Sequence, residues 1–238
     1  MENNTEINIL TIDIGGSHIK ATILNAEGVP ISDYARMPTP QPSTPVNVIN
    51  LIKELVKNFT GYDKISVGFP GFVKNGIIKT APNLGSESWA DYPLQTNLSA
   101  LLSRPAKVVN DADLQGVGMV SGEGLEMMVT LGTGFGTALL LDGKLLPHFE
   151  IAHHPVKTDR DYDEYIGEAA YKRKGKDHWN YRMKKVFAIL KTVFNYDRLY
   201  ISGGNAKNLT IPLDDNMIIV NNREGIKGGA RLWSKDNE

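Results

Sequence analysis

The sequence predicts an α/β protein made of two related lobes, and three observations lead to this prediction. Each half of the chain opens with β-branched strands joined by tight turns, continues with helical spacing of apolar residues, and returns to a strand that ends in glycine. The returning strands, "DKISVGFPG" and "DRLYISGGN", match at their leading aspartate and basic residue. Because little else in the two halves is identical, the repeat is one of pattern. Each lobe should hold a mixed sheet covered by helices.

The first half supplies three strands, a helix and a fourth strand. The strands are expected over Ile7–Ile14, over His18–Leu24, near Pro30–Tyr34 and in "DKISVGFPG". A helix should start at Ser43 or Thr44, with Pro45 in its first turn, and keep its apolar spacing as far as Phe59.

The second half repeats this order. "MMVTLGTGFGTALLLDGKLLP" predicts two strands around a glycine turn and a short third strand after an Asp-Gly turn, and helices are expected between Asp161 and Phe194. "NNREGIKGGARLW" should form a helix after Asn222 that returns to the first lobe. The first lobe would then comprise residues 1–110 and 223–238, and the second residues 111–222. Two lobes would form a cleft, which is a favoured place for a ligand.

The composition excludes several classes of protein. The 238 residues include 26 basic and 27 acidic side chains, a balance that argues against nucleic-acid binding. Cysteine is absent, which excludes disulfides and thiolate metal sites. The polar start "MENNTE" is unlike a signal peptide, and no apolar run reaches the roughly 18 residues that a membrane helix needs. We therefore expect a soluble cytoplasmic protein without nucleic-acid or membrane partners.

A first candidate site lies in "TIDIGGSHIK", where an apolar strand ends in an acidic residue and two glycines. Gly15 and Gly16 could present backbone N–H groups to a phosphate oxygen. Asp13 could hold a Mg²⁺ ion through water, and Lys20 completes the group. The alternative is a plain β-hairpin whose glycines serve only the turn.

A second glycine turn has the equivalent place in the second half. It comprises Gly132, Thr133, Gly134 and Gly136, and the threonine adds a hydroxyl donor. A hairpin is again the alternative, but two such turns could face each other across the cleft and fit a polyanion such as the phosphate chain of a nucleotide. The sequence has no G-x-x-x-x-G-K-[ST] motif, so it is not that of a P-loop protein.

A third candidate site lies in "VVNDADLQG", where a strand ends at Asn110 and a helix starts. Asp111 at this place could take the proton of a substrate hydroxyl as a phosphoryl group arrives. The alternative role for Asp111 is a helix N-cap. Asp113 should point elsewhere.

A looser group comprises Glu150, His153, His154 and Glu168. The two adjacent histidines could bind a metal, but such pairs seldom converge on one ion and no cysteine assists them. Carboxylates and a histidine near a cleft also suit hydrogen bonds to a polyhydroxy ligand, as does the amide of Asn83. The alternative for Asn83 is a turn residue.

Together these segments resemble the ROK family of sugar kinases, which has the actin-like ATPase (ribonuclease H-like) fold. The resemblance covers nearly the whole chain. "DIGGSHIK" and "LGTGFGTALLLDGKL" are similar to the two phosphate motifs of the family, "GFPGFVKNG" and "APNLG" to its glycine-proline loop and sugar-binding asparagine, "NDAD" to its catalytic segment, and "ISGGNA" to its adenosine-side motif. "NDAD" and "YIGEAAYKRKGKDHWNYRM" are most similar to the polyphosphate glucokinase branch.

The resemblance implies a hexose, commonly glucose, as phosphoryl acceptor, Mg²⁺ as cofactor, and ATP or polyphosphate as donor. It makes Asp111 the general base. It implies donor-binding positions at Asp13, Gly15, Gly16, Lys20, Gly132, Thr133, Gly134, Gly136, Gly203 and Gly204. It implies sugar-binding positions at Asn83, Asn110, Asp111, Glu150, His153 and Glu168. Structural zinc is not expected, because the three-cysteine motif of many ROK proteins is missing here, and a homodimer is expected.

Other functions fit parts of this pattern. They are a non-catalytic sugar-binding regulator, a kinase for mannose or an acylated hexosamine, and a structural actin-like subunit. The presence of Asp13, Asp111 and both glycine turns argues against lost catalysis. A structural subunit would leave the proposed sugar-side residues without a role.

Basic side chains are concentrated between Tyr171 and Val186. They are Lys172, Arg173, Lys174, Lys176, Arg182, Lys184 and Lys185. They could form a solvated helix face, or a track for a long polyanion such as polyphosphate.

Overall fold

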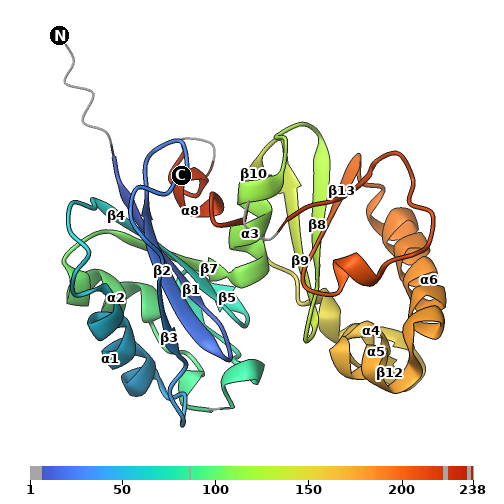
Figure 1. Ribbon diagram of the computed structural model, residues 1–238, viewed down its shortest axis with the longest axis horizontal. Coiled ribbons are helices and arrows are strands. Elements are labelled where there is room, and N and C mark those ends of the chain that lie inside the picture. Colours follow the sequence, from blue (N-terminus) through green and yellow to red (C-terminus); the bar gives the residue numbers. More distant parts are fainter. Residues whose placement is uncertain (1–6, 86, 222–224, 235–236, 238) are drawn as a thin grey trace. The chain divides into compact units, whose positions relative to one another are not determined.

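The computed structural model describes residues 7–85, 87–221, 225–234 and 237, and the chain divides into two compact units (Figure 1). Unit 1 comprises Met1–Gly118 and Ile226–Glu238, and unit 2 comprises Met119–Gly225. The sequence-based division at residue 110 therefore falls earlier than the boundary between the units. Of the expected C-terminal helix, residues 223–224, 235–236 and 238 lie outside the described residues.

Unit 1 contains a five-stranded sheet in the order β3-β2-β1-β4-β7. Its strands are β1 Ile9–Ile14, β2 His18–Leu24, β3 Ala35–Pro38, β4 Lys64–Phe69 and β7 Ala106–Asn110. The first three strands are antiparallel neighbours, whereas β4 runs parallel to β1 and β7 runs parallel to β4. The sheet is therefore mixed, as the sequence predicted.

The third strand lies later in the sequence than we predicted. Over Pro30–Tyr34 the chain forms an isolated bridge between Leu24 and Pro30. The side chain of Ser32 then accepts a hydrogen bond from the Ile23 backbone N–H at 2.8 Å, in the place of a backbone carbonyl. Regular pairing with β2 begins only at Ala35, so the prediction of a strand near Pro30–Tyr34 was wrong.

Unit 2 repeats the topology of unit 1, with the order β10-β9-β8-β13-β14. Its strands are β8 Leu125–Leu131, β9 Phe135–Leu141, β10 Lys144–Leu145, β13 Arg198–Ser202 and β14 Met217–Ile219. The antiparallel and parallel pairings also have the same sequence as in unit 1. The predicted relationship between the two halves is thus confirmed at the level of strand order and direction.

One face of the unit 1 sheet is covered by α1 Pro45–Val56 and α2 Leu94–Leu102, whose apolar side chains share a core with the strands (Figure 1). The N-cap of α1 is Thr44, whose hydroxyl oxygen accepts a hydrogen bond from the Asn47 N–H, as the Thr-Pro start predicted. The helix ends at Val56, before the expected Phe59.

The opposite face of this sheet carries α8 Gly228–Arg231 and the start of α3 Asp111–Met119. Ser66 Oγ on β4 donates to the Gly229 carbonyl at 2.6 Å and accepts from Trp233 Nε1 at 2.9 Å. Ser66 is fully buried, so these bonds satisfy a hydroxyl that would otherwise be costly inside the unit. The described part of the C-terminal segment is thereby fixed to unit 1.

The helices of unit 2 are α4 Tyr162–Ile166, α5 Glu168–Lys174 and α6 Lys176–Phe194. They occupy the expected helical region, divided at Gly167 and Gly175. Fully buried Trp179 anchors α6 by donating from Nε1 to the Ile166 carbonyl at 2.7 Å. None of the helices in the described ranges has the length and apolar character that a membrane crossing would require.

Short elements complete the described structure. The strands are β5 Val73–Lys74, β6 Ile77–Ile78, β11 Pro155–Lys157 and β12 Arg160–Asp161. The 3-10 helices are η1 Pro82–Leu84, η2 Glu87–Trp89, η3 Ile151–His153 and η4 Ala206–Asn208.

Packing of α8 against α3 leaves no room for a side chain at Gly228. A Cβ atom there would lie 1.7 Å from the Leu114 carbonyl oxygen, a backbone atom that can move only with its helix. Gly228→Ala should therefore lower the free energy of unfolding by about 1–3 kcal/mol, measured by urea denaturation. Gly132→Ala is the control, because a Cβ at Gly132 would meet no atom within 4 Å. Equal stability of the two variants would contradict this packing.

Candidate functional site

The first glycine turn joins β1 to β2 and is tightly held. Gly15 N–H donates to the His18 carbonyl at 3.0 Å, and the Gly15 carbonyl accepts from Thr39 Oγ1 at 2.6 Å. A Cβ at Gly16 would lie 3.2 Å from the Asn83 carbonyl oxygen, so η1 sits directly against this turn. The structure therefore brings Gly15, Gly16 and Asn83 together.

Asp13 lies on β1, on the sheet face that α8 and α3 partly cover. Its carboxylate accepts from Lys20 Nζ at 3.4 Å. In the parallel pairing of β1 with β4, Asp13 is the partner of Gly68. A Cβ at Gly68 would lie 3.3 Å from the Cα of Asp111. Because Gly68 has no side chain, the start of α3 can rest on the sheet beside Asp13.

Asn110 caps helix α3. Its Oδ1 atom accepts from the N–H groups of Ala112 at 2.8 Å and Asp113 at 3.4 Å, and its Nδ2 atom donates to the Gly71 carbonyl at 3.0 Å. Asp111 is the first residue of α3, and its own Oδ1 also accepts from the Ala112 N–H at 2.8 Å, so both side chains serve the start of the helix. Asp111 is only partly buried, whereas Asp113 is 3% exposed.

The second glycine turn joins β8 to β9. Gly132 N–H donates to the Gly134 carbonyl at 3.1 Å, and Gly136 N–H donates to Thr130 Oγ1 at 3.1 Å. Thr133 at the tip is exposed. This arrangement leaves the tip of the turn accessible to a ligand.

Asp163 contacts the second glycine turn, and the sequence analysis did not identify it as a candidate residue. Its Oδ1 atom accepts from the Phe135 N–H at 2.6 Å, and a Cβ at Gly134 would lie 2.8 Å from the same oxygen. Burial raises the pKa of the Asp163 carboxyl, and neighbouring Asp161 and Glu150 act in the same direction. No local pattern in "DYDEYIG" distinguishes this aspartate from an ordinary helix-start acid.

Two further segments hold the second turn in place. Glu168 N–H donates to the carbonyls of Gly132 at 3.0 Å and Thr133 at 3.2 Å. Asn205 donates from its backbone N–H to the Leu131 carbonyl at 2.8 Å and from Nδ2 to the Gly132 carbonyl at 3.3 Å. The structure therefore brings the candidate donor residues Gly203 and Gly204, which precede Asn205, to the same turn.

Gly203 has to be glycine for conformational and steric reasons. Its φ is +96°, and a Cβ there would lie 2.4 Å from the Leu131 carbonyl oxygen. Gly204 is exposed, and a Cβ there would meet no atom within 4 Å. The first glycine thus serves the close packing of two loops, while the second has space around it.

Glu150 and His153 form a connected polar group in unit 2. His153 Nε2 lies 3.9 Å from Glu150 Oε2, and His153 Nδ1 lies 3.5 Å from Asp161 Oδ2. Glu150 Oε1 also lies 3.5 Å from His148 Nε2. The ring of His154 packs at a tilt near that of Tyr162, with 6.4 Å between the ring centres. Among the described residues, no group of three or more His, Cys, Asp or Glu side chains is placed to hold a metal ion.

Glu168, the remaining candidate for sugar binding in unit 2, is not part of the group formed by Glu150 and His153. Its carboxylate pairs with Lys172 Nζ at 2.6 Å along α5. A contact of this side chain with a sugar therefore stays a prediction, and it would have to compete with Lys172.

The basic cluster of α5 and α6 is smaller than the sequence suggested. Arg182 is 5% exposed, donates from Nη1 to the Tyr165 carbonyl at 2.7 Å and stacks on the Tyr165 ring at 4.5 Å. Its inclusion in a surface track was wrong, because the helix turns this side chain into the core. The remaining cations of the cluster are exposed.

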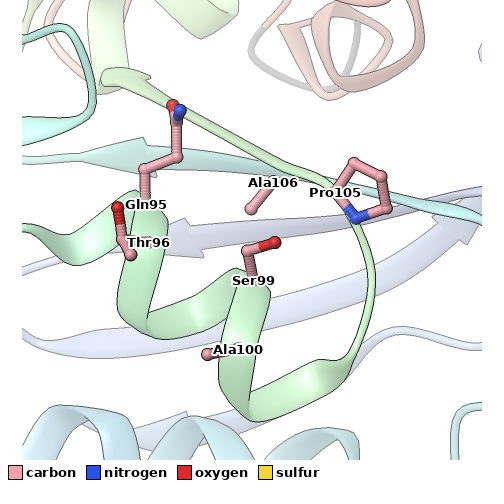
Figure 2. A pocket seen from close by; sticks show the side chains of 6 residues that line it. All are labelled: Gln95, Thr96, Ser99, Ala100, Pro105 and Ala106. Atoms are coloured by element: carbon pink, nitrogen blue, oxygen red, sulfur yellow. The ribbon is translucent and has the colours of Figure 1, made fainter.

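A pocket of about 510 Å³ lies in unit 1 between α2 and the start of β7 (Figure 2). Its lining residues are Gln95, Thr96, Ser99, Ala100, Pro105 and Ala106. Gln95 Oε1 accepts from the Val108 N–H at 3.1 Å and so satisfies a backbone group on this strand. None of the candidate site residues lines this pocket.

Comparison with known proteins gives a consistent result. The model of the ROK family matches residues 9–155. The chain is 34% identical over 245 residues to a polyphosphate glucokinase of Mycobacterium leprae, covering 94% of this chain and 74% of that protein. It is 32% identical over 239 residues to a polyphosphate glucokinase of Mycobacterium tuberculosis H37Rv, covering 92% and 88%.

Solved structures have the same fold. An inorganic polyphosphate/ATP-glucomannokinase from Arthrobacter sp. strain KM superposes with a TM-score of 0.83 at 28% identity, covering 94% of this chain and 97% of that chain. A ROK family glucokinase from Streptomyces griseus, crystallised with glucose and AMPPNP, gives 0.76 at 18% identity, covering 94% and 98%. A ROK family transcriptional regulator also gives 0.76, at 13% identity, covering 97% and 78%. The actin-like fold is therefore shown, but the fold by itself does not separate kinases from regulators.

The contact between Asp163 and the second turn gives a stability prediction. Asp163→Ala leaves the buried Phe135 N–H without its acceptor and should lower the free energy of unfolding by about 1–3 kcal/mol. Asp163→Asn keeps an acceptor oxygen, so it should lower the free energy of unfolding clearly less than Asp163→Ala does. Urea denaturation of both variants measures the difference, and equal losses would show that the hydrogen bond does not hold the turn.

The raised pKa of Asp163 adds a pH dependence to this comparison. The native state binds a proton on Asp163 more tightly than the unfolded chain does, so this group's contribution to stability falls as pH rises from the ordinary pKa of an aspartate through the raised one. Asp163→Asn removes the titration. The stability of this variant relative to wild type should therefore rise with pH over the same interval.

Proposed function

The chain belongs to the ROK family, and from this premise we propose that it is a glucokinase-type hexose kinase, which transfers a phosphoryl group from ATP or polyphosphate to a sugar hydroxyl, most often that of glucose. The observation that carries the proposal is that the backbone of Asp111 rests on Gly68, the residue that pairs with Asp13 on the neighbouring strand of unit 1. A carboxylate able to accept a proton and a carboxylate suited to a hydrated metal thereby lie over neighbouring strands.

In this proposal Asp111 is the general base. It accepts the proton of the sugar hydroxyl as the hydroxyl oxygen bonds to the arriving phosphorus and the donor's bridging oxygen leaves. Asn110 supports this role because its side chain caps α3 and so fixes where the next residue stands. Phosphoryl transfer needs little covalent work from the protein, so positioning and charge stabilisation account for most of the rate.

Asp13 is proposed to hold Mg²⁺ through water. Magnesium keeps several waters and takes one or two carboxylates, and the partly exposed Asp13 fits this requirement. When bound, Mg²⁺ would neutralise charge on the donor phosphates. Lys20 and the backbone N–H groups of both glycine turns are proposed to bind those phosphates, together with Thr133, Gly203 and Gly204.

Sugar hydroxyls are proposed to be bound in unit 1 by Asn83 and Asn110, and in unit 2 by Glu150, His153 and Glu168. The Glu150–His153–Asp161 chain supports this assignment, because it provides acceptors and a donor oriented by mutual contacts. Structural zinc is not part of the proposal. We further propose that the enzyme is a cytoplasmic homodimer.

A kinase for mannose or an acylated hexosamine is the alternative acceptor class. Turnover measured with glucose, mannose and N-acetylmannosamine at equal concentrations, with ATP and with polyphosphate, separates these possibilities. A non-catalytic regulator would bind a sugar but give no sugar phosphate with either donor.

Asp111→Asn tests the assignment of the base. The amide cannot accept the proton, so kcat with glucose and ATP should fall on the order of 100-fold or more, while glucose affinity measured by calorimetry should change little. Asp33→Asn, at an exposed aspartate of unit 1, is the control and should leave kcat unchanged. Near-normal turnover by a folded Asp111→Asn protein would contradict the role of Asp111.

The exposed cations of α5 and α6 are proposed to be a solvated face. Replacing Arg173, Lys174 and Lys176 together with alanine should change the ratio of polyphosphate-dependent to ATP-dependent turnover by less than about twofold, as expected for exposed charges. Steady-state kinetics with both donors at fixed ionic strength measures the ratio. A selective loss of polyphosphate use would instead establish the track.

A further inference from the structure

A row of charged side chains crosses three neighbouring strands of unit 1. In the antiparallel register Asp13 on β1 is opposite Lys20 on β2, and Lys20 is opposite Arg36 on β3. His18, two residues before Lys20, projects from the same face because side chains alternate along a strand. Arg36 Nη2 lies 3.0 Å from each ring nitrogen of His18.

This placement is unfavourable for the stability of a sheet. Like charges directly opposite each other on antiparallel strands destabilise the pairing, and Lys20 and Arg36 are such a pair. Asp13 compensates one of the two positive charges, at 3.4 Å from Lys20 Nζ. Two cations and an imidazole on one exposed strand face are therefore better explained by an anionic ligand than by folding.

The row is rigidly connected to the first glycine turn. Thr39, which follows β3, is 7% exposed and donates from its hydroxyl to the Gly15 carbonyl at 2.6 Å and from its N–H to the Ser17 carbonyl at 3.0 Å. These bonds fix β3, and with it Arg36, in register with the turn. A ligand that binds at Gly15 and Gly16 would therefore find Arg36 at a defined distance.

The row also has a direction. Asp111 stands over Gly68 on β4, and Asp13, Lys20 and Arg36 follow on β1, β2 and β3. Neighbouring strands are about 4.8 Å apart, so Arg36 lies about 10 Å beyond Asp13, away from the proposed base. A chain of phosphates whose reacting end is near Asp111 would reach Arg36 with its later groups.

We propose that Arg36, oriented by His18, forms an additional phosphate subsite that binds polyphosphate groups remote from the one transferred. The planar guanidinium can bind phosphate oxygens in a bidentate manner, which Lys20 cannot do. The inference rests on the proposed kinase function and deepens it, because it assigns to unit 1 a determinant for the longer donor.

Binding of long-chain polyphosphate to the full-length protein, measured by calorimetry at several salt concentrations, tests the subsite. Arg36→Ala should weaken binding on the order of tenfold and reduce the slope of log affinity against log salt by about one, as expected for the loss of one phosphate contact. His18→Ala keeps the guanidinium charge, so it should weaken binding less and leave the slope unchanged.

Lys53→Ala is the control, because Lys53 is an exposed cation on α1, which packs on the opposite face of the same sheet. It should change neither the affinity nor the slope. The inference is overturned if Arg36→Ala binds polyphosphate as wild type does, if Lys53→Ala weakens binding equally, or if wild type does not bind polyphosphate. Failure of the kinase function would show differently, as the absence of glucose phosphorylation by wild type with ATP.

Discussion

The missing side chain at Gly68 is the constraint on which the unit 1 site depends. Any Cβ at this position would press on Leu114 and on the Cα of Asp111, so only glycine lets α3 begin on the surface of the sheet. The parallel register of β1 and β4 then places Asp13 next to this contact. The side chain of Asn110 stabilises the start of α3, because it caps the helix and donates to the Gly71 carbonyl. The role proposed for Asp111 thus depends on the backbone geometry that places this residue beside the strand of Asp13.

Unit 2 holds its glycine turn in another way. The tip of the turn is stabilised from α4 by the carboxylate of Asp163, from α5 by the N–H of Glu168 and from the loop after β13 by Asn205. Backbone groups of a turn held on several sides lose little entropy when a ligand binds, which favours affinity. The partial burial that raises the pKa of Asp163 is a consequence of placing a carboxylate beneath such a turn.

Local patterns predicted most of the fold. Strand alternation and turn glycines located β1, β2, β4, β8, β9 and β13, and the Thr-Pro start located α1, because these signals depend on a few adjacent residues. The strand near Pro30–Tyr34 was misplaced because Ser32 takes over a backbone hydrogen bond. Arg182 was wrongly counted among the surface cations, because a series of basic residues does not indicate which of them stacks on the Tyr165 ring. Asp163 and the capping by Asn110 depend on long-range or side-chain geometry that the sequence does not express.

The C-terminal segment has a consequence for the order of events during synthesis. Ser66 bonds to Gly229 across 163 residues, so the face of the first sheet is finished by a segment made after all of unit 2. Contacts that close such long loops form late in folding. On the ribosome, unit 2 can complete its core before the C-terminal segment that packs on β1 and β4 has been synthesised. Domains are often expected to mature from the N-terminus onward, but here the first unit to be translated should be the last to finish.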